Sequence, residues 1–365
     1  MKKKDTAAVV GQKDVDSLRS RWFIKDPDTG LTARETMLEK LKTECRPENS
    51  QRPVGLDLRG ISLINEDLKG LDLSLYDFSH ANLNRSNLAG SNVSYCRFQG
   101  ASLEKACLDE CEFLGSDLSH ASLNECTANR TGFGGTDLSN TSMIGAQMNE
   151  STLSQSKLVD ADLRAVSIRN SRITETDLSG SLFTRAVLQG SDLKNSNVLK
   201  ASFDLADMRD CRLLGIRNFA SARWIGTDIR GLDLRGAYLV RRHIADENYL
   251  YEFKTRSRSH GAIYWIWWFT SDCGRSLLRW FVWLLVVTFV FAGIYTQVAI
   301  DYGDYRTVFS PVYFSIVTLT TLGYGDAIPM SLTAQIFVTI QAFTGYMGLG
   351  GLLSILGNKM ARRSE

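Results

Sequence analysis

The chain has 365 residues, a formal net charge of +2 and 22% charged residues, so its composition excludes both a strongly acidic and a strongly basic protein and points to no partner by charge. This average conceals two parts of the chain that differ in composition. Residues up to about 260 are polar and rich in Ser, Asn, Asp and Arg, whereas nearly all long apolar runs follow Tyr264.

The chain begins MKKKDTAAVVGQKDVD, which has a basic start but no apolar core behind it. This pattern is not that of a signal peptide, and we expect the N-terminal part to stay in the cytoplasm. Residues 1–53 are expected to form a tail or cap. TARETMLEKLK (32–42) fits one amphipathic helix; the alternative for the first forty-five residues is a disordered or loosely helical tail.

From Leu58 an apolar residue recurs at every fifth position as far as Leu213, with Ala128 as the weakest step. A small residue stands two positions before each of them, and Asp or Asn often stands one before. A period of five fits neither a helix nor an alternating strand. After Phe219 the frame moves by one residue and gives Trp224, Ile229, Leu234, Leu239 and Ile244.

Lines such as ANLNRSNLAGSNV and SDLSHASLNE resemble the pentapeptide-repeat family over residues 54–245. The resemblance implies a right-handed, four-sided β-helix in which the central Leu or Phe and the small residue point inward, with four units in each coil. Eight coils at strand spacing would give a rod about 38 Å long. Such a rod needs its ends covered, and we expect the caps before Gly55 and in the shifted units near Trp224.

The rod carries no visible chemistry. His80 and His120 occupy equivalent outward positions two coils apart, about 10 Å, which is too far to share a metal. Balanced surface charge argues against a nucleic-acid mimic and against a nucleic-acid-binding track. Four cysteines occupy the small buried position and are expected to be reduced structural thiols rather than disulfides or zinc ligands: Cys96, Cys111, Cys126 and Cys211.

Residues 246–275 form the expected linker, and its stretch IYWIWWFT (263–270) places three tryptophans and a tyrosine beside basic residues. This composition favours an interfacial helix lying along the inner leaflet of a membrane. The alternative is an aromatic cap on the last coil of the rod.

Two uncharged segments are long enough to cross a bilayer, and we expect transmembrane helices at 276–300 and 330–358. A basic tail follows at 359–365. Between the spans, at 301–329, PVYFSIVTL (311–319) is apolar but suffices for only about 14 Å of helix. This segment must therefore enter the membrane and return, and the non-helical backbone after it must be buried in protein or face water.

That backbone is TLTTLGYGD (318–326), where Gly323 and Gly325 permit positive φ and so allow successive carbonyls to point the same way. Residues 275–360 resemble the two-transmembrane potassium channels, which are tetramers. The resemblance implies that four such loops replace the water shell of a potassium ion with carbonyl oxygens. It identifies the selectivity filter as Thr321, Leu322, Gly323, Tyr324 and Gly325.

The resemblance implies further roles around the filter. Thr321 would supply a carbonyl and its hydroxyl to the innermost site, and the ring of Tyr324 would pack against the pore helix of its own or the next subunit. The residues expected to support the filter are Thr320, Asp326, Tyr313 and Val317. Val317 stands where some members have a Glu that bonds the acid after the filter, so Tyr313 is the candidate substitute.

The second span carries the residues expected to form the hinge and the gate. Gly345 lies twenty residues past Gly325, where the family has its inner-helix hinge. Leu353 and Leu356 are candidates for the inner gate, and Pro311 suits the first turn of the pore helix. The neighbouring Gly348, Gly350 and Gly351 offer flexibility or close helix packing.

The chain is therefore expected to have a mixed fold: a right-handed quadrilateral β-helix of pentapeptide repeats, then an α-helical two-span pore domain with a re-entrant pore helix. Basic residues lie before the first span and after the second, whereas the loop after the first span holds Asp301, Asp304 and Arg306. This distribution indicates that both termini are cytoplasmic. A multi-pass protein of a membrane such as the bacterial inner membrane is expected.

The function expected is passive, potassium-selective conduction by a homotetramer in a lipid bilayer, with cytoplasmic rods that regulate or assemble it and that bind an unknown protein or small ligand. The alternative is a binding module in which the rod does the work and the membrane segment is an anchor. No nucleophile–base pair or metal cluster is visible, so we expect no enzyme, no nucleic-acid partner and no cofactor, with potassium as the permeant ion.

Overall fold

The computed structural model describes residues 11–49, 52–233 and 235–364. The chain divides into two compact units, Met1–Tyr249 and Leu250–Glu365, and each is described by itself. Residues 1–10, from which the absence of a signal peptide was inferred, and Leu234 of the shifted repeat frame lie outside the described residues.

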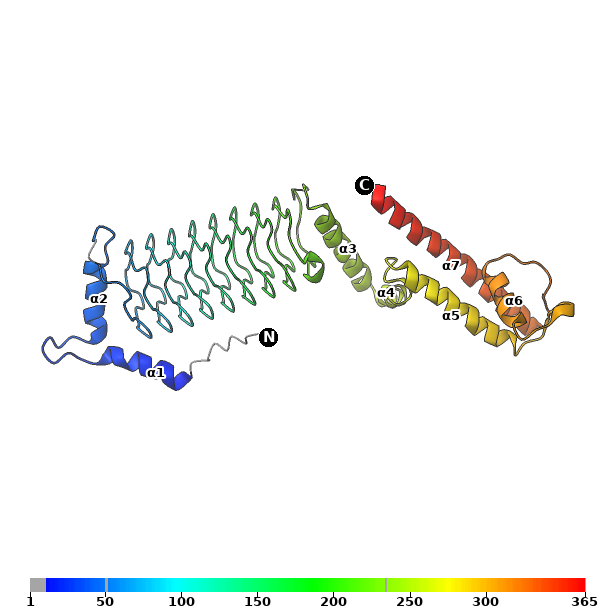
Figure 1. Ribbon diagram of the computed structural model, residues 1–365, viewed down its shortest axis with the longest axis horizontal. Coiled ribbons are helices and arrows are strands. Elements are labelled where there is room, and N and C mark those ends of the chain that lie inside the picture. Colours follow the sequence, from blue (N-terminus) through cyan, green and yellow to red (C-terminus); the bar gives the residue numbers. More distant parts are fainter. Residues whose placement is uncertain (1–10, 50–51, 234, 365) are drawn as a thin grey trace, which may run out of the picture. The chain divides into compact units, whose positions relative to one another are not determined.

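The first unit is a β-helix whose coils stack one on the next (Figure 1). Parallel bridges join residues twenty positions apart, as in Asp57 with Asp77, which confirms four five-residue units per coil. One of the four ladders passes through nine levels, and the eight steps between them are eight coils of twenty residues, which agrees with the expected number: Asp57, Asp77, Arg97, Asp117, Asp137, Lys157, Asp177, Asn197 and Arg217. Eight steps at strand spacing span about 38 Å.

The core of the rod is filled by the central residue of each unit, which is buried in every unit from Leu58 to Leu213. Where aromatic residues occupy this position in successive coils they stack, as Phe78 does on Phe98 with ring centroids 4.9 Å apart. Polar residues at the small position are buried but bonded: the Ser91 hydroxyl donates to the Leu68 carbonyl at 2.7 Å. The interior of the β-helix is therefore lined by apolar side chains, and the polar groups at its inner corners have hydrogen-bond partners.

The corners of the coil demand a left-handed backbone at every fifth residue, two positions after the central residue. Glycine fills this position in some units, but many units hold other residues, such as Ala165 with φ of 56°. A non-glycine residue with this φ is strained because its Cβ approaches the backbone carbonyl. The repeat pattern therefore stores a small cost at each of these corners.

Replacing Ala165 by glycine is expected to raise the free energy of unfolding of the β-helix by about 0.5–1 kcal/mol, because the corner loses its strain and the exposed methyl group makes no core contact. Thermal unfolding of the full chain, followed by circular dichroism at the strand signal, measures the change. The matched control is Ala161→Gly, in the buried small position, which is expected to lower stability. A lower melting temperature for Ala165→Gly would contradict the account.

The four cysteines at the small position are buried free thiols, as expected. Burial raises the pKa of Cys96, Cys111, Cys126 and Cys211 to about 12. The thiol of Cys96 donates to the Leu73 carbonyl at 3.0 Å, so the protonated form is built into the coil.

These raised pKa values predict a loss of stability in alkali. The folded state holds the thiol protons more tightly than the unfolded chain, so stability is intact below pH about 9 and falls as the pH rises from there towards 12. We expect Cys211→Ala to be less sensitive to this change than the parent chain, as measured by the melting temperature between pH 8 and 11. Equal pH dependence in both proteins would contradict the burial argument.

The N-terminal end of the rod is capped, as expected, by α1 (Gln12–Ser20), η1 (Arg21–Phe23) and α2 (Ala33–Glu44). α2 begins in a capping box formed by Thr32 and Glu35, which explains why this segment is a regular helix. Trp22, Leu41 and Cys45 from these elements join the hydrophobic core of the rod. The first residues are thus an ordered lid, and the alternative of a disordered tail does not hold for residues 11–49.

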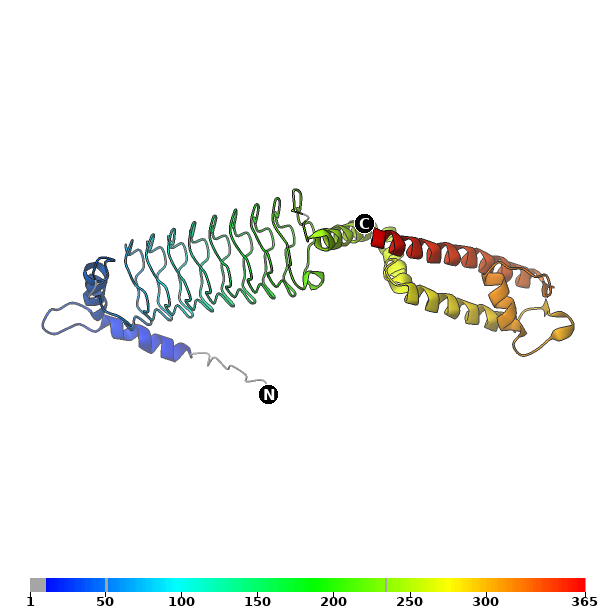
Figure 2. The ribbon, with the colours of Figure 1, turned by 45° about the horizontal axis from the view of Figure 1, so that its top comes forward.

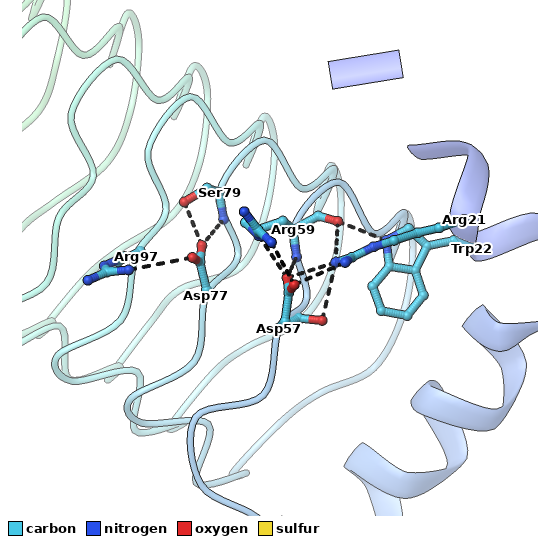
Figure 3. Close-up of polar contacts among 7 residues, drawn as sticks. All are labelled: Arg21, Trp22, Asp57, Arg59, Asp77, Ser79 and Arg97. Atoms are coloured by element: carbon cyan, nitrogen blue, oxygen red, sulfur yellow. Dashed lines mark hydrogen bonds and ion pairs between the residues drawn. The ribbon is translucent and has the colours of Figure 1, made fainter. Parts of the chain in front are cut away.

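Polar contacts fix this cap in place (Figure 3). The guanidinium of Arg21 donates two hydrogen bonds to the carboxylate of Asp57, at 3.0 and 2.7 Å, and the indole N–H of Trp22 donates to the Arg59 carbonyl at 2.8 Å. The Arg21 and Arg59 side chains together hold the pKa of Asp57 well below its usual range. The carboxylate of the first coil is therefore paired with a guanidinium of the cap.

The C-terminal end of the rod differs from the expectation. The shifted units near Trp224 are part of the coil itself, because Arg223 pairs with Ser202 across the one-residue slip, which η2 (Phe219–Ser221) absorbs. The cap is instead α3 (Tyr238–Thr255), which buries Val240 and Ile244 in the core of the rod. Asn248 pins the helix there with bonds from its amide to the Trp224 carbonyl and from the Gly226 N–H to its oxygen.

The repeat pattern extended to residue 245 is therefore wrong at its last positions, where Leu239 lies on a helix and is 67% exposed. A spacing of five between Leu239 and Ile244 looks like another repeat. Val240 and Ile244, four residues apart, fit one helix face equally well and are the residues that are buried.

The second unit is helical (Figure 2). Its elements are α4 (Arg258–Ser271), α5 (Leu277–Tyr295), β1 (Ile300–Asp301), η3 (Gly303–Tyr305), α6 (Ser310–Leu319), β2 (Ile328–Pro329) and α7 (Leu332–Ser364). β1 and β2 pair antiparallel, Ile300 opposite Pro329. The short α6 packs between α5 and α7, and the loop 320–327 joins it to β2.

The aromatic segment 263–270 lies on α4, in the second unit. The last coil of the rod is covered by Val240 and Ile244 of α3, and the interfacial role of α4 stays a prediction. Most of the large side chains of segment 263–270 are exposed, and the ammonium of Lys254 lies over the rings of Tyr264 and Trp265, 5.2 and 5.3 Å from their centroids. An exposed aromatic face beside a cation is the arrangement typical of an interfacial helix.

Candidate functional site

Two helices of the second unit are long and apolar enough to cross a membrane. α5 has 19 residues with a mean hydropathy of 2.2, and the part of α7 from Leu332 to Gly357 has 26 residues with a mean hydropathy of 1.4. Most of the side chains in these segments are not buried within the chain. An apolar helix exposed along its length needs lipid or another protein chain around it.

The helix α6 is the short element between the spans, and it carries Pro311 in its first turn, as expected. The Ser310 hydroxyl accepts a bond from the Thr307 N–H at 2.8 Å and so satisfies a donor just ahead of the helix. Ten residues give about 15 Å of helix, half the thickness of a bilayer core. α6 and the loop after it form the re-entrant segment predicted from the sequence.

α6 ends in a Schellman motif made by the threonines. The Leu322 N–H donates to the Val317 carbonyl at 3.0 Å, and the Thr321 N–H donates to the Thr318 carbonyl at 3.1 Å. Thr321 occupies the left-handed position, with φ of 56°, where glycine is the usual residue. Thr320 and Thr321 therefore terminate the helix and turn the chain into the filter loop.

Positive φ recurs at alternate residues of the filter loop: Thr321 at 56°, Gly323 at 54° and Gly325 at 79°. A polypeptide of alternating backbone hand turns its carbonyls towards one side instead of alternating them. Nothing within the chain lies within 4 Å of a Cβ placed on either glycine. The glycines are therefore required by conformation and not by crowding within one chain.

The side chains of the filter loop face away from their own chain. Leu322 is 57% exposed and Tyr324 is 67% exposed. The ring of Tyr324 is therefore not covered by its own pore helix, which leaves the other expectation, packing against a neighbouring copy. The Thr321 hydroxyl donates to the Thr320 carbonyl at 2.7 Å.

The outer end of the loop is tied back to α6. The phenolic O–H of Tyr313 donates to the carboxylate of Asp326 at 2.7 Å, the contact that the sequence suggested in place of a missing Glu. Val317, at the position of that Glu, is buried and apolar. Beyond Asp326 the Met330 N–H donates to the Ala299 carbonyl at 3.0 Å, which extends the pairing of β1 with β2 by one bond.

A buried polar cluster joins the three helices behind the filter, and the sequence analysis missed it. Its members are Thr288 and Tyr295 of α5, Ser315 of α6 and Gln341 of α7. We call it the three-helix node. The available signal was Gln341 itself, an amide in an uncharged span, because polar residues inside membrane segments usually face a protein partner.

Gly345 lies on an unbroken helix, since α7 runs from Leu332 to Ser364. A Cβ at Gly345 would stand 2.1 Å from the Leu319 carbonyl oxygen and 2.8 Å from its carbon, both backbone atoms at the end of α6. Close packing against the pore helix is therefore a sufficient reason for glycine here. Its role as a hinge stays a prediction.

The glycines that follow divide between two roles. A Cβ at Gly348 would meet Leu284 at 2.5 Å and one at Gly351 would meet the Trp280 ring at 2.6 Å, whereas Gly350 is open. The indole N–H of Trp280 donates to the Gly348 carbonyl at 2.8 Å. Gly348 and Gly351 thus form a notch that receives Trp280 from α5, which is the close packing suggested from sequence.

The gate candidates Leu353 and Leu356 are exposed on α7, one turn beyond this notch. Exposure on a single chain is compatible with a position on an axis between copies. Their role as a gate stays a prediction.

Comparison with known proteins divides the chain in the same way. Residues 281–362 match the family model described as an ion channel. Overlapping segments from residue 96 to residue 210 match the pentapeptide-repeat model. Neither family is enzymatic, which supports the expectation that the chain is not an enzyme. The two resemblances drawn from the sequence are thereby confirmed.

Two curated relatives are similar over the channel region. Two-pore potassium channel 1 of Arabidopsis thaliana is 36% identical over 58 residues, 16% of this chain and 16% of the relative. Two pore potassium channel b of Oryza sativa subsp. japonica is 33% identical over 96 residues, 25% of this chain and 27% of the relative. The chain thus spans about a quarter or less of the length of these relatives.

A solved structure is similar to the repeat region. QnrB1, described as a plasmid-mediated fluoroquinolone resistance protein, aligns with a TM-score of 0.47 at 19% identity, covering 53% of this chain and 98% of its own.

Proposed function

We propose that four copies of this chain form a potassium-selective channel whose filter is the backbone of residues 321–325. The observation that carries the proposal is the alternating backbone hand at Thr321, Gly323 and Gly325 in a loop that directly follows a half-membrane helix. The ion-channel match over residues 281–362 supports the class of function. The relatives named as potassium channels support the choice of ion.

The homotetramer is proposed because one chain supplies only one wall of a pore. A ring of carbonyls that replaces a hydration shell needs several identical loops around an axis. The large side chains of the filter and of α7 that are exposed on one chain would then be covered by neighbouring copies and the axis: Leu322, Tyr324, Phe343, Tyr346 and Met347.

The negative end of α6 supports the same arrangement. Four such helix ends converging below the filter would favour a cation there. In this arrangement potassium is the permeant substrate, and its ligands are the main-chain oxygens and the Thr321 hydroxyl, which turns from the Thr320 carbonyl to the ion.

Both termini are proposed to lie in the cytoplasm, with α4 along the inner leaflet. Lys254, Arg256, Arg258, Arg275 and Arg279 surround α4 and the start of α5. Positive charge at one end of the spans is typical of the cytoplasmic side. The rods would then be cytoplasmic, in a membrane such as the bacterial inner membrane.

The rod is proposed to regulate or assemble the pore, through a cytoplasmic ligand or protein acting by way of residues 246–279. Deleting residues 1–245 and recording currents tests this. We expect a lower tetramer yield or a changed open probability. Unchanged values of both would refute a role of the rod in assembly or regulation while leaving the pore assignment intact.

The pore assignment is tested by potassium flux into liposomes that contain the purified full chain, with its mass in detergent measured in parallel. We expect four copies per particle and a flux that depends on the protein. Folded tetramers that pass no potassium under any condition would overturn the proposal, and so would monomers or dimers.

A further inference from the structure

The three-helix node is a fully bonded polar cluster inside an apolar helix bundle. Ser315 and Gln341 are 0% exposed, and Tyr295 and Thr288 are also buried. Ser315, the member of the node on α6, is six residues ahead of Thr321, the first residue of the proposed filter. The node residues are buried within one chain, so any effect of the node on the proposed filter would act through the position of α6.

Every polar group of the Gln341 amide has a partner. Its oxygen accepts from the Tyr295 O–H at 2.5 Å. Its nitrogen donates to the Ser315 hydroxyl at 2.6 Å and to the Ser315 carbonyl at 3.1 Å. The Ser315 hydroxyl in turn donates to the Thr288 carbonyl at 2.8 Å. One orientation of the amide satisfies this pattern, because the Ser315 carbonyl can only accept.

These bonds fix α6 from two sides. Ser315 is held by Gln341 of α7 and by the backbone of α5, and the neighbouring Phe314 packs edge-on against Tyr295 with ring centroids 5.0 Å apart. Apolar packing alone leaves a helix free to slide or rotate by small amounts, whereas directional bonds to two neighbours set both depth and rotation.

We propose that Gln341 is a positioning residue for ion selection: through Ser315 and Tyr295 it sets the depth and rotation of the pore helix, and hence the diameter at which the Thr321 end of the filter is held. The proposal rests on the proposed channel function. Four nodes, one per subunit, would hold the four pore helices at one height. If the pore helix were released from its node, the filter could change its diameter. It would then discriminate less well between potassium and sodium.

The alternative is that the node only stabilises the fold. Removing all polar partners of a buried hydrogen bond can be nearly neutral for stability, while removing one is costly. The double variant Tyr295→Phe with Gln341→Leu therefore separates the two ideas. For a merely structural node, stability and selectivity recover together in the double variant. For a positioning node, stability recovers towards that of the parent and selectivity does not.

The experiment measures the sodium-to-potassium permeability ratio from reversal potentials, and the melting temperature of the tetramer. The proteins are the parent chain, Gln341→Leu, Tyr295→Phe and the double variant. We expect the permeability ratio to rise about tenfold in Gln341→Leu, the equivalent of about 1.4 kcal/mol. A smaller rise is expected in Tyr295→Phe, which removes one oxygen and keeps the ring in place.

The matched control is Gln335→Leu, the same change on the same helix at an exposed position, which is expected to keep the parent ratio. If Gln341→Leu does not assemble, the ratio in Tyr295→Phe decides. Parent-like selectivity in every assembled node variant would overturn the inference while leaving the channel intact. A parent chain without selectivity would instead refute the proposed function.

Discussion

Replacing Gly323 by alanine is expected to abolish potassium flux. The residue has φ of 54°, and a Cβ at this φ is disfavoured by about 1–2 kcal/mol in each subunit, or roughly 4–8 kcal/mol around a ring of four. The added methyl group has room within its own chain, since nothing lies within 4 Å. The loss would therefore come from a carbonyl that turns away from the axis and not from a clash inside the chain.

Flux into liposomes measures this effect, with particle mass as the test of assembly. The control is Gly293→Ala, an exposed glycine of α5 that also has nothing within 4 Å but has no positive φ. It is expected to conduct like the parent. Parent-like flux through assembled Gly323→Ala tetramers would show that the backbone of this residue does not shape the pathway.

Replacing Gly345 by alanine is expected to reduce flux by more than tenfold and to change ion selectivity. Its Cβ would stand 2.1 Å from the Leu319 oxygen, so a helix backbone must move, at about 1–3 kcal/mol in each subunit for overpacking of this kind. Leu319 is the last residue of α6, two positions before Thr321. The displacement is therefore delivered to the inner end of the filter.

This result separates packing from hinge motion at Gly345. A glycine that serves as a hinge is expected, when replaced, to change the open probability and to leave selectivity unchanged. The matched control is Gly350→Ala, five residues further along α7, where a Cβ has open space. Selectivity equal to the parent in Gly345→Ala, with altered gating alone, would favour the hinge and contradict the packing account.

The β-helix could be predicted from sequence because its signal repeats. Each five-residue unit has an apolar central residue and a small residue two positions before it, and forms one side of a coil. The same pattern recurs in every unit from Leu58 to Leu213. The end of the rod could not be predicted in the same way. Near Leu239 the apolar spacing fits both a further unit and a helix face, and the choice depends on which residues meet Trp224 and the last coil.

The positive φ values of Gly323 and Gly325 could be predicted because their signal is local, and the filter role of the loop stays a proposal. Glycine at alternate positions indicates positive φ at those positions, and this signal does not depend on residues distant in sequence. The three-helix node could not be predicted, because its bonds join residues 26 and 46 positions apart in sequence. Gln341 was visible as an amide in an apolar span, but Tyr295 and Ser315 are ordinary residues until the helices are placed together. Gly345 shows the same limit, since only the position of Leu319 reveals what its missing Cβ makes possible.

The central claim is that main-chain oxygens of residues 321–325 select potassium. The most direct test is the reversal potential of the reconstituted full chain with potassium on one side of the membrane and sodium on the other. The account predicts a potential close to that of a membrane permeable to potassium alone. A potential near zero, with currents carried equally by both ions, would contradict it.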